Sequence, residues 1–90
     1  MRTLREFMKQ LEKGQLTTEE VMIARDLIRI GDPNVLNQVS IGDIQSGKFR
    51  LYKNDKAICD IVKENNHYTI VMEKEVNESK RVDTWIKQYI

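Results

Sequence analysis

The chain has 90 residues, of which 40% are hydrophobic and 32% charged, with four Gly and one Pro. This composition is typical of one small globular domain and excludes a disordered chain. Fifteen Lys and Arg against 14 Asp and Glu leave a net charge of +1, which excludes attraction to nucleic acid or an anionic membrane through overall charge alone. The chain has no apolar run of about 18 residues and no signal-like N-terminus, and its single Cys allows no internal disulfide. We therefore expect one cytoplasmic domain, residues 1–90.

Two helices are predicted near the N-terminus. Thr3 with Glu6, and again Thr17 with Glu20, have the spacing of a capping box, and a glycine follows each apolar stripe as a stop signal. The first stripe consists of Leu4, Phe7, Met8 and Leu11, and the second of Val21, Ala24, Leu27 and Ile28. Stripes of this period predict helices that bury one side.

Residues 31–47 carry weaker signals. Asp32 followed by Pro33 is a good helix start. A short helix is expected there, with an apolar face made of Val35, Leu36 and Val39. Ile41 and Ile44, which follow among two Gly and an Asp, are interpreted as anchors of a connecting loop.

Apolar and polar residues then alternate through three predicted strands near 48–53, 57–63 and 68–75. A three-residue loop ending at Lys56 would place Phe49 opposite Ile61, whereas a two-residue loop would place it opposite Asp60. We favour the longer loop because it gives a common apolar face, although Lys56 would then need a left-handed conformation.

At the second turn, a two-residue loop of Asn65 and Asn66 places Ile61 opposite Ile70, and Asn tolerates the positive φ that such a turn requires. The inner face of the predicted sheet consists of Phe49, Leu51, Ala57, Cys59, Ile61, Tyr68, Ile70 and Met72. The outer face consists of Arg50, Tyr52, Ile58, Asp60, Val62, Thr69, Val71 and Glu73. The inner set is a core, and the outer set is a mixture of apolar and charged residues.

The last predicted helix follows a cap at Asn77 or Ser79 and runs to the last residue, Ile90. Its stripe consists of Val82, Trp85, Ile86 and Tyr89, and Trp85, as the largest side chain, is expected to be the main anchor. The sequence therefore predicts an α+β domain in two layers, with two to three N-terminal helices, a three-stranded antiparallel meander and a C-terminal amphipathic helix.

The residue pattern does not point to catalysis. Cys59 and His67 are the only thiol and imidazole, and the predicted register places them on opposite faces about 17 Å apart, at ~3.3 Å per strand residue. One Cys and one His are too few for a zinc site. The segment "GDIQSG" lacks the Lys-Ser/Thr ending of a phosphate loop. We expect no enzymatic activity, no metal and no cofactor.

Three helices followed by a basic hairpin give an outline that resembles a winged helix. In that resemblance, residues 18–30 are the first helix of the helix-turn-helix, 33–40 the recognition helix and 48–63 the wing. The candidate nucleic-acid contacts are Lys48, Arg50, Lys53 and Lys56. The resemblance implies a DNA-binding regulator that uses residues 33–40 and the basic hairpin 48–56.

The outer sheet face gives the second hypothesis. Its apolar residues are Tyr52, Ile58, Val62 and Val71, and we interpret them as a protein interface. The alternative is that residues 41–47 or the last helix cover this side. Of these two hypotheses, we favour a small non-catalytic interaction module, a regulator or adaptor that binds another protein or a second copy of itself. DNA binding is the alternative, and no membrane partner is expected.

Overall fold

The computed structural model describes residues 1–29 and 31–89, and Ile30, Ile90 and the side chain of Ile28 lie outside that description. Within it, the helices are α1 (Leu4–Glu12), α2 (Thr18–Ile28), α3 (Pro33–Gln38) and α4 (Val82–Tyr89). The strands are β1 (Arg2–Thr3), β2 (Val39–Ile41), β3 (Lys48–Lys53), β4 (Lys56–Lys63), β5 (Tyr68–Met72) and β6 (Glu75–Ser79). The predicted α+β class is confirmed, but the three-stranded meander understates the sheet.

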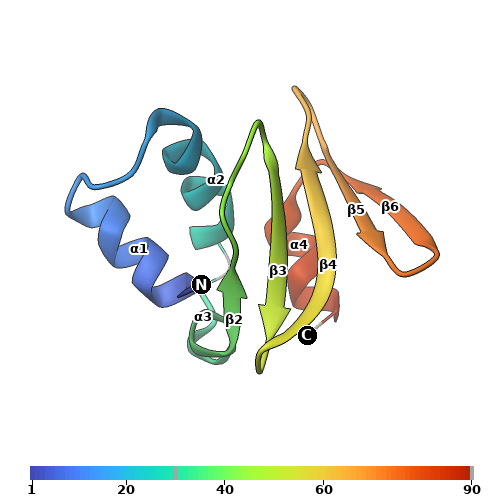
Figure 1. Ribbon diagram of the computed structural model, residues 1–90, viewed down its shortest axis with the longest axis horizontal. Helices are drawn as coiled ribbons and strands as arrows, with labels where there is room; N and C mark the ends of the chain where they lie inside the picture. The colour runs from blue at the N-terminus through green and yellow to red at the C-terminus, as the bar shows by residue number, and fades with distance from the viewer. Residues whose placement is uncertain (30, 90) are drawn as a thin grey trace.

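All six strands form one antiparallel sheet in the order β1–β2–β3–β4–β5–β6, so each strand pairs with the next one along the chain. The predicted meander is its centre, and β1, β2 and β6 extend it on both sides. In Figure 1, α4 lies behind β3 and β4, while α1 and α2 lie toward the β2 side of the molecule. None of the described helices crosses in front of β3, β4 and β5, so one face of these strands is uncovered.

The core lies between the sheet and the helices. The strands contribute the buried residues Val39, Ile41, Phe49, Leu51, Cys59, Ile61, Tyr68 and Ile70. The helices contribute Leu4, Phe7, Ile23, Ala24, Leu27, Val35, Leu36, Val82 and Ile86. Of the residues predicted for the inner face, Ala57 is exposed, whereas Met72 is half-buried and packs against the core. Val39 and Ile41, expected in a helix and a loop, instead flank Ser40 in β2 with both side chains buried.

The first hairpin has a two-residue turn rather than the predicted three-residue loop. Asn54 and Asp55 both have positive φ, 52° and 64°, and Lys53 pairs with Lys56 across the turn. These angles suit a tight hairpin, in which Asn and Asp are tolerated. Lys56 begins β4 with a negative φ, so the strain expected at this residue is absent.

A β-bulge then restores the register that the sequence predicts. Tyr52 pairs with Ala57, whereas Leu51 pairs with Cys59, so Ile58 is an extra residue in β4. Beyond the bulge, Phe49 pairs with Ile61 and Arg50 with Asp60, as expected. The bulge also explains why Ala57 is exposed, because it places Ala57 opposite Tyr52 instead of on the inner face.

The second turn has the predicted register and a different backbone. Ile61 pairs with Ile70, and the Glu64 N–H donates to the His67 carbonyl at 2.8 Å around the two Asn residues. Neither Asn65 nor Asn66 has a positive φ. The third turn is absent from the sequence prediction: β5 ends at Met72, which pairs with Glu75 of β6, and Glu73 takes the positive φ of 48° between them.

Both predicted capping boxes are present. The Thr3 hydroxyl accepts from the Glu6 N–H at 3.1 Å, and the Thr17 hydroxyl accepts from the Glu20 N–H at 3.2 Å. Asp32 caps α3 as expected, accepting from the Asn34 N–H at 2.9 Å. The start of α4 differs from the prediction of a cap at Asn77 or Ser79. Asn77 lies in β6, and the Ser79 hydroxyl accepts from the Arg81 N–H, just before the helix.

Candidate interaction surface

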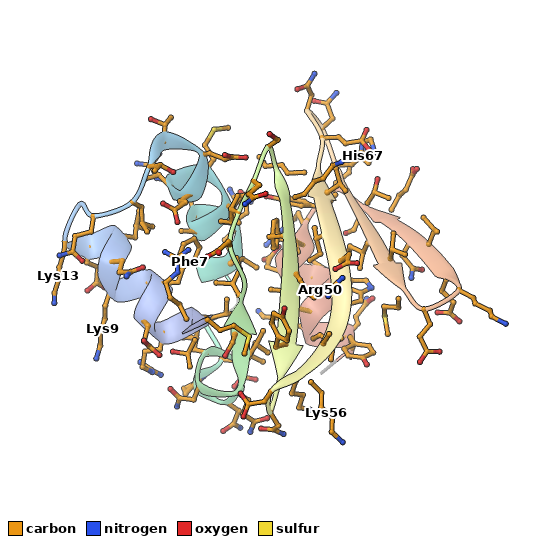
Figure 2. All side chains as sticks on the ribbon, in the orientation of Figure 1. Phe7, Lys9, Lys13, Arg50, Lys56 and His67 are labelled. Carbon is orange, nitrogen blue, oxygen red and sulfur yellow. The ribbon has the colours of Figure 1, made fainter. Side chains whose placement is uncertain are left out.

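We define the outer face by the residues that alternate with the buried strand residues and therefore point away from the helix-covered side. The pairing register arranges them in rows across the sheet. One row consists of Lys48, Val62, Thr69 and Glu78, taken from β3 to β6. The next consists of Arg50, Asp60, Val71 and Val76. Tyr52 lies beyond the second row, opposite Ser40 of β2 and Ala57 of β4. Figure 2 shows Arg50 on this side of the sheet.

Three of the four predicted interface residues lie on the outer face. Val62 and Val71 are half-buried and occupy neighbouring strands on a diagonal, since Val62 pairs with Thr69, two residues from Val71. Residues in this relation lie about 7 to 8 Å apart on one face of a sheet. Tyr52 is also half-buried, and a Cβ added at Gly42 would lie 3.4 Å from its ring.

Ile58 does not belong cleanly to this set. As the extra residue of the bulge, it is half-buried and packs against the hydrophobic core. It borders a hollow together with Met72 and Tyr89, which lie on the helix side. The alternation of side chains between the two faces, from which its position was predicted, does not hold at a bulge. The extra residue changes the face to which the neighbouring side chains point.

Val76 was missed by the sequence analysis. It pairs directly with Val71 and is 65% exposed. The sequence "EVNES" has one apolar residue and no alternation, so it does not show the pattern of a strand. Only the turn before it indicates that it pairs with β5. Val62, Val71 and Val76 together form an apolar strip across β4, β5 and β6, which we call the valine strip.

A charge pair borders the valine strip. Arg50 donates to both carboxylate oxygens of Asp60, from Nε at 2.6 Å and from a terminal nitrogen at 3.1 Å. The hydrogen bond to Asp60 raises the pKa of Arg50 above its usual value, and the same bond holds the pKa of Asp60 below its usual value. Both side chains are about half exposed, so solvent screens the pair and its contribution to stability is small. Arg50 is thus already paired with an acid within the chain.

The four predicted nucleic-acid contacts do not form one free basic surface. Lys48 and Lys56 are exposed, Lys53 is half-buried, and Arg50 is paired with Asp60. The predicted wing, β3 and β4, lies in the middle of the sheet with β2 and β5 on either side. The predicted recognition helix offers four polar residues for base contacts, Asn34, Asn37, Gln38 and Ser40. The first three are exposed, whereas Ser40 is half-buried and lies in β2.

Cys59 and His67 lie apart, as the sequence predicts. Cys59 is buried on the inner face, where burial, with a smaller effect of the Asp60 charge, raises the pKa of the thiol to about 12. A thiol of this kind is a poor nucleophile at neutral pH. His67, at the second turn, is 3.5 Å from Glu64 through Nε2. Among residues 1–29 and 31–89, no group of three or more His, Cys, Asp or Glu is arranged to hold a metal ion.

The sequence analysis also missed a polar cluster that joins α2 to the sheet. The Tyr68 hydroxyl donates to Asp26, and Lys63 Nζ lies 3.1 Å from both the Asp26 carboxylate and the Tyr68 oxygen. Lys63 also lies 4.7 Å from the centre of the Tyr68 ring. Burial, followed by the hydrogen bond to Asp26, raises the pKa of the Tyr68 phenol far above its usual value. Because its pKa is raised, the Tyr68 phenol stays protonated at neutral pH. It therefore links α2 to the sheet through Asp26 and does not act as a base.

The segment before β3 lies beside the outer face, where Asp43 and Gln45 border a hollow together with Val62. The Gly42 N–H donates to the Arg50 carbonyl at 2.9 Å, and the Gln45 and Lys48 backbones exchange two bonds of 2.9 Å. Gly47 has φ 75°, and its N–H donates to the Glu19 carboxylate of α2. A Cβ at position 47 would meet a backbone oxygen of β4 at 3.2 Å, so only Gly fits comfortably.

No protein-family model, curated protein or solved structure matches the chain. Within the described residues, none of the helices is both long and apolar enough to cross a lipid bilayer. The outer face is therefore interpreted from its own geometry.

Proposed function

We propose that the protein is a small non-catalytic interaction module, a regulator or adaptor, that binds a protein partner through the outer face of its sheet. The observation that supports this most directly is the valine strip on a face that the described helices leave uncovered. A solvated face of an antiparallel sheet is usually polar. Contiguous apolar residues on such a face, with charges at the border, are typical of protein interfaces.

The cost of leaving the strip exposed supports the same proposal. Val76 is 65% exposed although Thr, which has the same shape, would suit a solvated strand. The core does not need these side chains, because the inner face of β3, β4 and β5 already consists of buried residues. These are Phe49, Leu51, Cys59, Ile61, Tyr68 and Ile70. A partner that covers the strip would remove apolar area from water, which favours binding by about 25 cal/mol per Å² before the entropy lost on association is subtracted.

The test places a charge in the strip. Val71→Lys should remain folded, with the free energy of unfolding lowered by no more than about 1 kcal/mol, because the side chain can reach solvent. It should lose the partner that immobilised wild-type protein captures from the host extract. Thr84→Lys, at an exposed position of α4 on the other side of the molecule, is the matched control and should retain that partner.

Two results would contradict the proposal. If Val71→Lys captures the same partner as Thr84→Lys, the outer face is not the binding surface. If Val71→Lys unfolds, the face belongs to the core. Ile58→Glu is unsuitable for this test because Ile58 packs against the core, and we expect this variant to lose about 2 kcal/mol or more of stability.

A further inference from the structure

We propose that the protein partner adds an extended strand to the open edge of β6, antiparallel to it, and so continues both the sheet and the valine strip. This inference rests on the proposed function, since it names the way in which a protein partner would reach the outer face. It is carried by the unpaired backbone groups of β6 and by the charges of its side chains.

β6 is the longer of the two edges of the sheet. The sheet ends at β1 on one side and at β6 on the other, and β1 has two residues whereas β6 has five. In Figure 1, β6 is the outermost strand on the right, and none of the described helices lies beyond it. An edge strand presents a row of unpaired N–H and C=O groups. A further strand therefore has room to pair with β6.

The pairing with β5 decides which backbone groups of β6 are unpaired. Met72 and Glu75 flank a two-residue turn, so they exchange both N–H···O=C bonds, and bonded pairs then alternate along the two strands. The N–H and C=O groups of Val76 and Glu78 consequently point away from β5. No other backbone-to-backbone bond reaches these two residues in the part of the chain that the structure describes. The residues of β6 that bond to β5 are Glu75, Asn77 and Ser79.

The spacing of the unpaired groups fits an extended backbone. Val76 and Glu78 are two residues apart, which is about 7 Å at ~3.3 Å per residue, the repeat of a neighbouring strand. Their side chains share the outer face, because residues two apart in a strand point the same way. Val76 is 65% exposed, and Glu78 is exposed as well. A strand bonded to these groups would place its side chains beside Val76 and bury apolar area that β6 leaves in water.

The charges of β6 favour a basic strand. Residues 75–79 contain two acids, Glu75 and Glu78, and no Lys or Arg, while Lys74 and Lys80 lie just beyond the two ends. No ion pair joins either acid to another described residue. Basic residues opposite these acids would form cross-strand pairs of opposite charge, which stabilise a sheet.

The antiparallel direction fixes the order of the complementary residues. The residue opposite Glu78 comes first in the added strand, and those opposite Asn77, Val76 and Glu75 follow. The complementary sequence is therefore Lys-Thr-Val-Lys. It places a base opposite each acid, a polar residue opposite Asn77, and a valine that extends the valine strip by one strand.

A second copy of the chain fits this edge less well. Antiparallel pairing of two β6 strands bonds all the unpaired groups only when Val76 faces the partner's Glu78, and this register brings Lys74 level with the partner's Lys80. If Val76 faces the partner's Val76, Glu78 lies opposite Lys74 of the turn, so a single pair of strand residues exchanges bonds. Charged residues on an edge strand also discourage pairing with an identical edge. A basic strand of another protein meets none of these obstacles.

Two labelled peptides of about ten residues test the register, with binding to the full chain measured by fluorescence anisotropy. One is centred on Lys-Thr-Val-Lys, and the other on Glu-Thr-Val-Lys, which differs only opposite Glu78. Wild type should bind the first about fivefold or more tightly than the second, because the second places an acid beside Glu78. Glu78→Lys should reverse this preference. Glu12→Lys, the same charge change at an exposed position of α1, is the control and should keep the wild-type preference.

Proline tests the backbone contact. Val76→Pro removes the N–H that points to the open edge and keeps the bonds to β5, so the variant should fold, with an unchanged circular dichroism spectrum. It should weaken binding of the Lys-Thr-Val-Lys peptide about tenfold or more. Val76→Thr, which keeps the N–H and the shape of the side chain, should bind within about threefold of wild type. If Val76→Pro does not fold, the reversal by Glu78→Lys decides the proposal.

The contrary results are distinct. Wild-type protein that does not bind the Lys-Thr-Val-Lys peptide at about 1 mM would overturn the strand addition, as would a folded Val76→Pro that binds it like wild type. A preference that Glu78→Lys leaves unchanged would overturn the register. Dimerisation of wild type in sedimentation, abolished by Val76→Pro, would assign the edge to a second copy instead.

The proposed function is decided separately, by capture from the host extract. A partner that Val71→Lys loses, and that Val76→Pro and Thr84→Lys both retain, would support the outer face as the binding surface and overturn the strand addition. A partner that Val71→Lys and Val76→Pro both lose, and that Thr84→Lys retains, is the result expected if both proposals hold.

Discussion

At the scale of single residues, the thiol of Cys59 is buried and therefore protected from reagents in solution. The one thiol is 5% exposed, and burial raises the pKa of Cys59 to about 12. We expect thiol reagents at neutral pH to modify folded protein only as fast as the structure opens, and to modify protein in concentrated guanidinium chloride at once. Cys59→Ala should cost about 1 to 2 kcal/mol of stability and leave partner binding unchanged. Rapid labelling of the native protein would contradict this assignment.

Tyr68 makes a pH-dependent contribution to stability. Its hydrogen bond to Asp26 should make Tyr68→Phe less stable by about 1.5 to 3 kcal/mol at pH 7. Burial, with that hydrogen bond, raises the folded-state pKa above the ordinary value of about 10. A raised pKa gives stability that is present below pH 10 and is lost as pH rises toward the folded value, because the unfolded phenol ionises first.

The free-energy difference between wild type and Tyr68→Phe should therefore shrink by about 1.4 kcal/mol per pH unit above pH 10. Urea unfolding of both proteins between pH 8 and 11 measures it, and the titration of Cys59 cancels because both proteins contain it. Tyr89→Phe is the control, since that phenol belongs to a residue that is 46% exposed. A difference between wild type and Tyr68→Phe that stays constant with pH would contradict the shifted ionisation.

At the scale of elements, the sequence predicts what neighbours along the chain determine. The capping boxes at Thr3 and Thr17 depend on residues three positions apart, and both are present. The register of Phe49 with Ile61 follows from the need for one apolar face, and it is correct even though the loop that was invoked for it is not. The β-bulge at Ile58 shifts the register by one residue, as the longer loop would have done. Bulges leave no reliable pattern in a single sequence.

The sequence did not predict β1, β2 and β6, for a different reason. β1 has two residues and β2 has three, too few to show a period. β6 carries one apolar side chain and is specified by its pairing with β5 rather than by its own alternation. The Asp26–Lys63–Tyr68 cluster joins residues 37 and 42 positions apart in the chain, so only the packed fold brings it together. On the outer face, Tyr52, Val62 and Val71 could be placed from the sequence.

The anchor of α4 is a second correction at this scale. Val82 and Ile86 are fully buried, while Trp85, predicted as the main anchor, is half-buried and stacks on Tyr89 with ring centres 5.2 Å apart. We expect Ile86→Ala to lower the free energy of unfolding by about 2 to 5 kcal/mol, because it leaves a cavity in the core. Trp85→Ala should cost less, about 1 to 2 kcal/mol. Denaturant unfolding that ranks the two variants in the opposite order would restore Trp85 as the anchor.

At the scale of the whole molecule, the described helices lie on one side of the sheet, with α4 behind β3 and β4, and leave the opposite face of β3, β4 and β5 uncovered. This asymmetry distinguishes the two functional hypotheses. An interface needs an uncovered apolar surface, which the valine strip supplies. A winged helix needs a hairpin that projects from the domain, whereas β3 and β4 are held between β2 and β5. The basic residues of that hairpin also differ in exposure, and one of them is already paired.

We therefore expect no strong binding of mixed duplex DNA. Phosphate contacts dominate such binding, and only Lys48 and Lys56 of the predicted set are both exposed and without an acid partner among the described residues. Two phosphate contacts would give a salt slope of about −2, against the slopes several times larger of proteins that contact six or more phosphates. Fluorescence anisotropy with a labelled duplex at low and physiological salt measures the affinity and this slope. A tight complex with a steep slope, weakened by Lys56→Ala, would establish the hairpin as a nucleic-acid surface, because Lys56 lies at the turn and away from the valine strip.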